Sequence, residues 1–523
     1  MERRWPAPAR EGVALAMILA AGLWLRLWGL SYGLPHPMAR PDEEVLVARL
    51  LGFDAGDPNP HWFMYPTFYL YLLYGWVKAL VLAAHALGLA PATALADLAR
   101  RDPARLYLLA RSLSVVLGTL AIAVGFFLAR ALWDARAGLL AALLLAVAFL
   151  HVRDSHFFKP DVAQALGTAA TLLACVGLAR RPTPAAAALA GTACGLTLGV
   201  KYNLALFLPL GIAALQGGRA GAWRRLLVGG AAAVVALIVT SPYIVLDYRT
   251  FLGWMAYTRL LLGYGGSGVG TGFRYHAEQS FLLAHGLPLS LLMLGAVAWG
   301  VRSASLLPIT AFVLASVAEL GVSALAYTRY VTPLVPVLCV LAGGALARLV
   351  ARLPAAAPRA ALSTLLLIVL LAQPLHNSVR FDQIAARPDT RLLARSWLED
   401  HVPAGASILV LGSDWPFTFG DPVVDGYRVR RNPTLDPALG ISYVLTHEHP
   451  LPFSRLPESF ESLRPRLRLE ATFSPFADEE APPGVVFETR DAFYVPLAGF
   501  DGVVRGGPII RIYSVRGPPA AQP

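Results

Sequence analysis

Three carboxylates, Asp42, Glu43 and Glu44, follow one another just after the first long apolar stretch of the chain. Acidic side chains beside apolar surroundings are costly unless they are solvated or used. A carboxylate held in such a place can take a proton as a general base. Acidic residues also suit the first turn of a helix, so they could instead cap a helix that begins at Val45. The spacing leaves both interpretations open.

A second polar segment, residues 151–161, lies between two apolar stretches. It contains two histidines and two aspartates, which are metal-ligand types, but their spacing is not diagnostic of a metal site. We favour the interpretation that Asp161 is a second acid facing the first across a cleft. The alternative is an ordinary solvated loop.

Three basic residues, Arg111, Lys201 and Arg329, are placed at the ends of apolar stretches. Such side chains can simply extend to the lipid headgroups. They can also bind phosphate, for which Arg offers two parallel donors and Lys a point charge. Glu319, about ten residues before Arg329, is the acid embedded most deeply in an apolar stretch. It is a functional candidate or the partner of a basic neighbour.

The composition shows which kind of element must position these residues. The 523 residues are 56% hydrophobic and 15% charged, whereas soluble proteins carry about 25% charged residues. Apolar runs of about 17–25 residues, long enough to cross a bilayer, recur over residues 12–376. The net charge of +11 comes from arginines between these runs, where they set topology, so nucleic-acid binding is not expected. Three cysteines within apolar runs exclude a disulfide framework.

Eleven spans are predicted, and the positive-inside rule gives a multi-pass protein of the cell membrane with a cytoplasmic N-terminus. Residues 64–87 are not counted as a span. A span there would reverse the orientation of every later loop and place most of the arginines on the extracytoplasmic side. Their many Tyr and Trp residues favour a helix at the membrane interface. Hydropathy alone would instead predict that residues 64–87 cross the membrane. The predicted spans are 12–30, 106–129, 137–152, 161–179, 184–200, 202–216, 226–243, 279–300, 304–325, 330–347 and 360–376.

From residue 377 onward the apolar runs shorten to strand length, which predicts a soluble extracytoplasmic α/β domain over 377–523 after a membrane domain over 1–376. An amphipathic helix is expected at 391–400, with Leu392, Leu393 and Trp397 on one face. The expected strands are 407–411, 441–445, 485–488 and 509–515. The aromatic residues Trp415, Phe417 and Phe419 either contact lipid or substrate or, as we favour, form the core of this domain.

In their order along nearly the whole chain, these segments resemble glycosyltransferase family 39. Its membrane enzymes have the GT-C fold and include protein O-mannosyltransferases and the aminoarabinose transferases of lipid A. No single motif is specific, so the resemblance depends on the ordered set. This chain departs from the pattern at residues 64–66, where relatives often have Lys or His before two prolines. The matching segments are Asp42-Glu43, 64–66, 110–118, Arg153 with His156 and Asp161, 199–202, 329–333 and 397–405.

The resemblance implies transfer of a sugar from a polyprenyl-phosphate carrier to a protein, lipid or glycan acceptor on the extracytoplasmic face. It implies no obligate metal, although a divalent ion is not excluded. We expect an inverting displacement in which Asp42 is the base while Glu43 and Asp161 orient hydroxyl groups. The expected substrate-binding residues are Arg111, Arg153, His156, Lys201, Tyr202, Arg329 and Tyr330.

Two other functions are compatible with a polytopic chain. A transporter or flippase for a lipid-linked sugar would need polar groups and broken helices near the bilayer midplane. Here the ionisable residues gather at one face, with Glu319 the exception, which favours chemistry at the membrane surface. A non-enzymatic scaffold would tolerate loss of Asp42, Asp161 and Arg329 together.

Overall fold

The structure is a computed structural model, and it describes residues 7–91, 93–261, 271–353, 359–412, 418–422, 425–431 and 440–516. Its residues group into two compact units. Unit 1 comprises Met1–Leu27 and Val45–Val379, and unit 2 comprises Trp28–Glu44 and Arg380–Pro523. The sequence-based boundary at 376/377 lies close to the boundary at 379/380. The short segment Trp28–Glu44, which carries the first acidic group, is grouped with unit 2.

The regular secondary structure among the described residues of unit 1 is helical. Its first helices are α1 (Ala7–Leu27), α2 (Glu43–Asp54), α3 (Thr67–Ala86), α4 (Leu95–Arg101), α5 (Pro103–Leu132), α6 (Ala135–Val147), α7 (Phe149–Asp154), α8 (Pro160–Arg180) and α9 (Pro184–Val200). The next are α10 (Phe207–Gln216), α11 (Ala222–Thr240), α12 (Tyr243–Leu246), α13 (Tyr248–Leu261), α14 (Thr271–Tyr275), α15 (Leu287–Gly300), α16 (Leu307–Val322), α17 (Val335–Ala351) and α18 (Arg359–Ala385). Short turns η1 (Leu204–Leu206), η3 (Ala304–Leu306) and η4 (Thr328–Leu334), and the π-helix η2 (His276–Leu283), join some of them.

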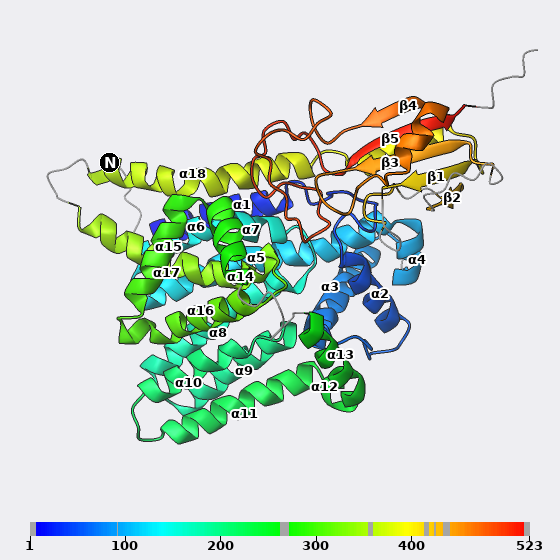
Figure 1. Cartoon of the computed structure of the whole chain (residues 1–523). Helices are drawn as coiled ribbons and strands as arrows, with labels where there is room; N and C mark the ends of the chain where they lie inside the picture. Colours follow the sequence, from blue (N-terminus) through cyan, green and yellow to red (C-terminus); the bar gives the residue numbers. More distant parts are fainter. Residues whose placement is uncertain are drawn as a thin grey trace, which may run out of the picture. The chain divides into compact units, whose positions relative to one another are not determined.

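Every predicted span falls on described helices, although the span 137–152 covers both α6 and α7, and the span 279–300 covers η2 and α15. Seven helical segments among the described residues are long and apolar enough to cross a membrane, and four shorter apolar helices accompany them. The chain is therefore a multi-pass membrane protein, as predicted. The seven include α3, whose interfacial position stays a prediction, and α1 is in neither set, so the number of spans stays a prediction too. In Figure 1, α3, α4, α12 and α13 gather at one end of the long helices.

Small residues allow α9 and α11 to pack backbone to backbone. A methyl group added to Gly191 would overlap the carbonyl oxygen of Gly229, and one added to Gly195 would overlap that of Ala233. Glycines four residues apart permit such close approach between membrane helices. This close packing of α9 against α11 fixes the position of the C-terminal end of α9, and Lys201 directly follows that end.

Unit 2 contains a five-stranded mixed sheet of order β2-β1-β3-β5-β4. β1 is parallel to β2 and β3, whereas β5 is antiparallel to β3 and β4. On one face, Ala394 and Leu398 of α19 (Thr390–His401) pack on the sheet, and the short α20 (Phe460–Leu463) packs on the other. The strands are β1 (Ser407–Leu411), β2 (Arg428–Arg430), β3 (Tyr443–Glu448), β4 (Leu467–Phe473) and β5 (Ile509–Val515).

The α/β character of this part is confirmed, with local differences from the sequence-based prediction. β1 and β5 have the predicted bounds, and β2 and β4 were not predicted. Residues 485–488 form no strand and contribute one isolated bridge, between Val486 and Ala498. Trp415 and Phe417 lie outside the described residues, whereas Phe419 is half-buried and its ring lies 5.6 Å from that of Phe453.

Candidate active site

A buried ion pair joins α8 to the end of α9. Asp161, the second residue of α8, accepts a hydrogen bond from Lys201 Nζ at 2.7 Å. Its side chain is 2% exposed, and that of Lys201 is 18% exposed. The second carboxylate oxygen, Oδ2, is buried without a hydrogen-bond partner among the described residues. Buried polar atoms of this kind are rare in native proteins, so this oxygen is available to a ligand.

Arg329 lies close to the same pair. Its guanidinium carbon is 4.3 Å from the ring centroid of Tyr327 and 5.8 Å from that of Tyr330. The Lys201 ammonium lies 4.6 Å from the same Tyr330 ring. Arg329 and Lys159, like Lys201, act electrostatically on the Asp161 carboxylate. Three basic side chains thus act on one carboxylate in this cluster, and Arg and Lys are the side chains that bind phosphate.

Arg153, on the short helix α7, supports this cluster. Its Nε donates to Asp154 Oδ1 at 3.0 Å, and its Nη2 donates to Thr328 Oγ1 at 2.8 Å. The Thr332 hydroxyl donates to the other oxygen of Asp154. These bonds attach η4 at both sides of Arg329, so in this structure Arg153 positions that residue.

His156, Arg111 of α5 and His151 of α7 are buried and contact other groups of the protein. His156 Nδ1 lies 2.9 Å from the Val152 carbonyl oxygen, so this nitrogen carries the proton and donates. Arg111 is fully buried, with its guanidinium carbon 5.1 Å from the Phe157 ring centroid. His151 Nδ1 accepts from Arg26 Nη2 at 2.9 Å. The described residues contain no group of three or more His, Cys, Asp or Glu side chains arranged to hold a metal ion.

Tyr202 and Glu319 lie near Lys201 and extend the candidate site. The Tyr202 hydroxyl is buried without a hydrogen-bond partner among the described residues. A buried hydroxyl without a partner among the described residues is available to a ligand. Glu319, on α16, is exposed and within electrostatic range of Lys201.

The first acidic group belongs to unit 2. Asp42 adopts a φ of 76°, a left-handed conformation that residues other than glycine rarely take. Glu43 is fully buried and begins α2, so the helix-capping interpretation and the functional one both fit the structure. Asp161 lies in unit 1, so the two acids predicted to face each other belong to different units.

The segment around Asp42 is held by residues of the tail. Arg40 Nη1 lies 2.6 Å from Asp491 Oδ2, and its guanidinium carbon is 4.5 Å from the Phe493 ring centroid. His36 Nδ1 accepts from the Met38 amide at 3.1 Å, and Nε2 donates to the Asp421 carbonyl oxygen at 2.7 Å. Burial first, and then the charge of Arg391, lowers the pKa of His36 to about 4. Sequence reasoning missed these contacts, because no local pattern links residues this far apart.

Unit 2 also contains an unpredicted chain of hydrogen bonds. Asp421 Oδ1 lies 2.9 Å from His447 Nε2, and His447 Nδ1 lies 2.9 Å from Ser454 Oγ. The Ser454 hydroxyl in turn lies 2.7 Å from that of Tyr494. The residue types match a hydrolytic triad. All four residues are at most 2% exposed, so the chain is a structural element of the domain core.

The comparisons with known proteins agree with this architecture. A family model described as dolichyl-phosphate-mannose-protein mannosyltransferase matches residues 107–246, about a quarter of the chain. ArnT from Cupriavidus metallidurans, solved bound to undecaprenyl phosphate, superposes with a TM-score of 0.54 at 16% identity, covering 98% of this chain and 100% of that one. The chain has the GT-C fold. The resemblance predicted from the ordered motifs is thereby confirmed.

A second GT-C structure is similar over a smaller share of its own length. The oligosaccharyltransferase of Archaeoglobus fulgidus, tethered to an acceptor peptide, has a TM-score of 0.50 at 13% identity, covering 84% of this chain and 69% of that one. Curated proteins gave no match. The family-model match runs from α5 to α12, so this GT-C chain carries Arg111, Asp161 and Lys201 within its matched segment.

Proposed function

We propose that this protein transfers a sugar from a polyprenyl-phosphate-linked donor to a protein, lipid or glycan acceptor. The observation that carries the proposal is the cluster of Asp161, Lys201 and Arg329 at the helix ends of a GT-C fold. The matched family is described by a mannosyl donor on dolichyl phosphate, and ArnT was solved with undecaprenyl phosphate. Both point to a lipid phosphate as the anion that the cluster binds.

Lys201 and Arg329 act on the leaving group, which is the phosphate of the lipid carrier. As the bond between the anomeric carbon and the phosphate oxygen breaks, negative charge grows on that phosphate. Lys201 and Arg329, already oriented by the rings of Tyr330 and Tyr327, stabilise this charge without having to reorganise. Arg111 of α5 adds a buried positive charge beside the Phe157 ring, and Arg153 and His156 act as positioning residues.

The acceptor oxygen would attack the anomeric carbon from the opposite side, which inverts its configuration. Asp42 takes the proton of the acceptor hydroxyl while the new carbon–oxygen bond forms. Glu43, Asp161 Oδ2 and the Tyr202 hydroxyl orient sugar or acceptor hydroxyls.

We place this chemistry on the extracytoplasmic side of the cell membrane, with the N-terminus in the cytoplasm. The positive-inside rule supports that orientation. With this orientation, the turns after α5, α8 and α10 are cytoplasmic. Arginines lie in or beside these turns: Arg130, Arg136, Arg180, Arg181 and Arg219. The start of α8 and the end of α9 then face outward.

The test is transfer from a panel of radiolabelled polyprenyl-phosphate sugars by the purified protein in lipid, with a membrane extract as acceptor. Wild-type protein is expected to label an acceptor, and Asp42→Asn is expected to abolish labelling while folding is retained. Asp501→Asn, an exposed aspartate of the same unit, is the matched control. Near-normal turnover by Asp42→Asn would show that Asp42 is not the general base. Donor that crosses the bilayer unchanged would support a flippase instead.

A further inference from the structure

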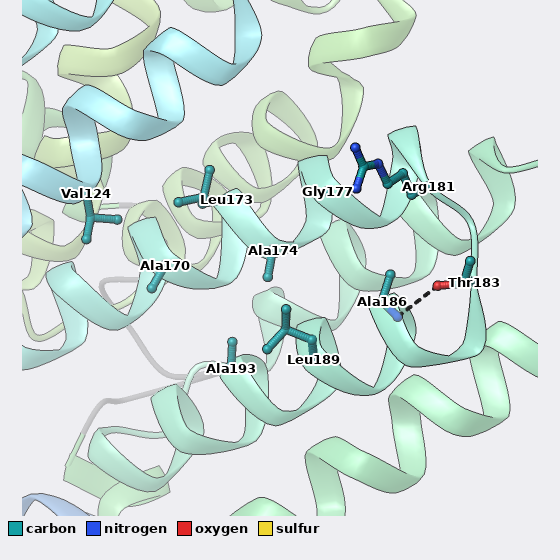
Figure 2. A pocket seen from close by; sticks show the side chains of 10 residues that line it. All are labelled: Val124, Ala170, Leu173, Ala174, Gly177, Arg181, Thr183, Ala186, Leu189 and Ala193. Carbon is teal, nitrogen blue, oxygen red and sulfur yellow. Dashed lines mark hydrogen bonds between the residues drawn. The ribbon is translucent and has the colours of Figure 1, made fainter.

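A groove with a volume of about 590 Å³ lies between α5, α8 and α9. Ala170, Ala174 and Gly177 form one side, at the helical spacing that puts them on one face of α8. Ala186, Leu189 and Ala193 of α9 form the other, and Figure 2 shows the two rows facing each other. The groove is open along its length, since Gly177 is exposed and Leu189 is 66% exposed. Its volume is in the range of small-molecule sites, which is about 300–1,000 Å³.

The groove lies towards the opposite end of α8 from the Asp161 cluster. Asp161 is the second residue of this helix, and Arg181 directly follows its last residue. A helix of this length rises about 30 Å, which is the thickness of the hydrocarbon core. The lining residues on α8 begin at Ala170, about halfway along. A lipid headgroup at Arg181 therefore belongs to the other leaflet from a donor phosphate at Lys201.

Positive charge marks the mouth of the groove. Arg181 lines it, and in Figure 2 its side chain runs back along α8 towards Gly177. Arg180 is exposed beside it and donates to the Ala131 carbonyl oxygen at the end of α5. Among the described residues that line the groove, none is acidic. The apolar walls suit an acyl chain, and the arginines suit a phosphate, which Arg binds through two parallel donors.

We propose that this groove binds one phospholipid with an anionic headgroup, whose acyl chain lies between α8 and α9 and whose phosphate contacts Arg181. Small residues on α8 make the space, and they recur with the helical period along one face. The site is separate from the proposed sugar-transfer site and does not depend on that function. Its occupant is a structural or regulatory lipid of the leaflet facing the arginine-rich turns.

The test is native mass spectrometry of the delipidated full-length protein titrated with dioleoylphosphatidylglycerol or with dioleoylphosphatidylcholine. The wild type is expected to retain phosphatidylglycerol at least fivefold more tightly. Arg181→Gln should remove this preference, and Arg181→Lys should retain part of it. Ala174→Leu should fill the groove and weaken binding of both lipids at least fivefold.

Two matched controls isolate the site. Arg219→Gln removes the same charge from another exposed turn, and Ala185→Leu adds the same bulk to an exposed position of α9 that does not line the groove. Neither should alter lipid retention. Equal binding of the two lipids, or an unchanged preference in Arg181→Gln, would overturn the proposal. So would displacement of phosphatidylglycerol by undecaprenyl phosphate at equal concentration, because the groove would then hold the carrier lipid.

Discussion

Arg40 and Asp491 are 451 positions apart in the chain and form a buried ion pair, with Nη1 2.6 Å from Oδ2. Their side chains are 1% and 3% exposed. Arg40 precedes Asp42 by two residues, so the pair fixes the backbone that carries the proposed base. The segment Trp28–Glu44 is thus a structural part of the C-terminal domain, and that domain is expected to be required for catalysis.

Breaking this pair should impair both folding and turnover. Asp491→Asn removes one carboxylate charge from beside the buried Arg40 guanidinium, and breaking a buried ion pair in this way costs about 3–5 kcal/mol. We expect a lower unfolding temperature for unit 2, and a reduced kcat with little change in KM for the donor. Thermal unfolding in lipid and steady-state transfer assays measure the two effects. Unchanged kcat in a folded Asp491→Asn protein would show that the pair does not position Asp42.

Removing the Lys201 ammonium should weaken the transition state for sugar transfer. Loss of one preorganised electrostatic donor typically costs about 10²–10³ in rate, and we expect that loss in kcat for Lys201→Met. Lys78→Met is the control, because Lys78 of α3 also pairs with an aspartate, Asp54, at the end of α2. If the two variants lost activity equally, the effect of Lys201 would be structural only.

Much of unit 1 could be predicted from the sequence because its signal is local. Apolar runs predicted the positions of the helices, whereas the topology inferred from the arginines between them stays a prediction. Lys201 and Arg329 were recognisable because a basic residue stands out at the end of an apolar run. The pairing of Lys201 with Asp161 follows from the antiparallel arrangement of α8 and α9, which their short connection favours.

What could not be predicted depends on contacts between distant residues. Nothing in the sequence near Arg40 indicates that Asp491 is its partner. The first and last residues of the short strand β2, Arg428 and Arg430, are exposed, so the strand has no apolar pattern that would identify it. The segment 485–488 has strand-like residues but forms a single bridge, because its neighbours are loops. Hydrophobic patterning cannot distinguish a strand from a buried loop of this length.

Acid should destabilise unit 2 through two buried histidines. The pKa of His36 is lowered from 6.5 to about 4, and that of His449 from 6.5 to about 3, in both cases chiefly by burial. The unfolded chain therefore binds more protons than the folded protein over this range, so stability is full above pH 6.5 and falls as the pH drops towards 4. For His36 alone the loss is on the order of 3 kcal/mol, at about 1.4 kcal/mol per pKa unit.

Hydrogen exchange of the β3 and β5 amides between pH 6.5 and 4 measures this effect, after correction for the intrinsic exchange rate. His36→Gln should roughly halve the pH dependence, because His449 continues to contribute. Asp389 does not interfere in this window. Its pKa, despite burial, is held below its ordinary value by Arg391, so its contribution is lost only at lower pH. A pH dependence that is identical in the variant would contradict the assignment to His36.

The contact between α9 and α11 should control the position of Lys201, which directly follows α9. A side chain at Gly195 meets the Ala233 carbonyl oxygen, so Gly195→Ala must push the helices apart, at a typical cost of about 1–3 kcal/mol. We expect reduced thermal stability and a larger KM for the donor, because the Lys201 ammonium moves away from Asp161. Gly230→Ala on α11 is the matched control, since a methyl group there meets no atom within 4 Å. This control should be neutral or slightly stabilising, as alanine favours the helix. Equal stability and equal KM in the two variants would show that the backbone contact does not position Lys201.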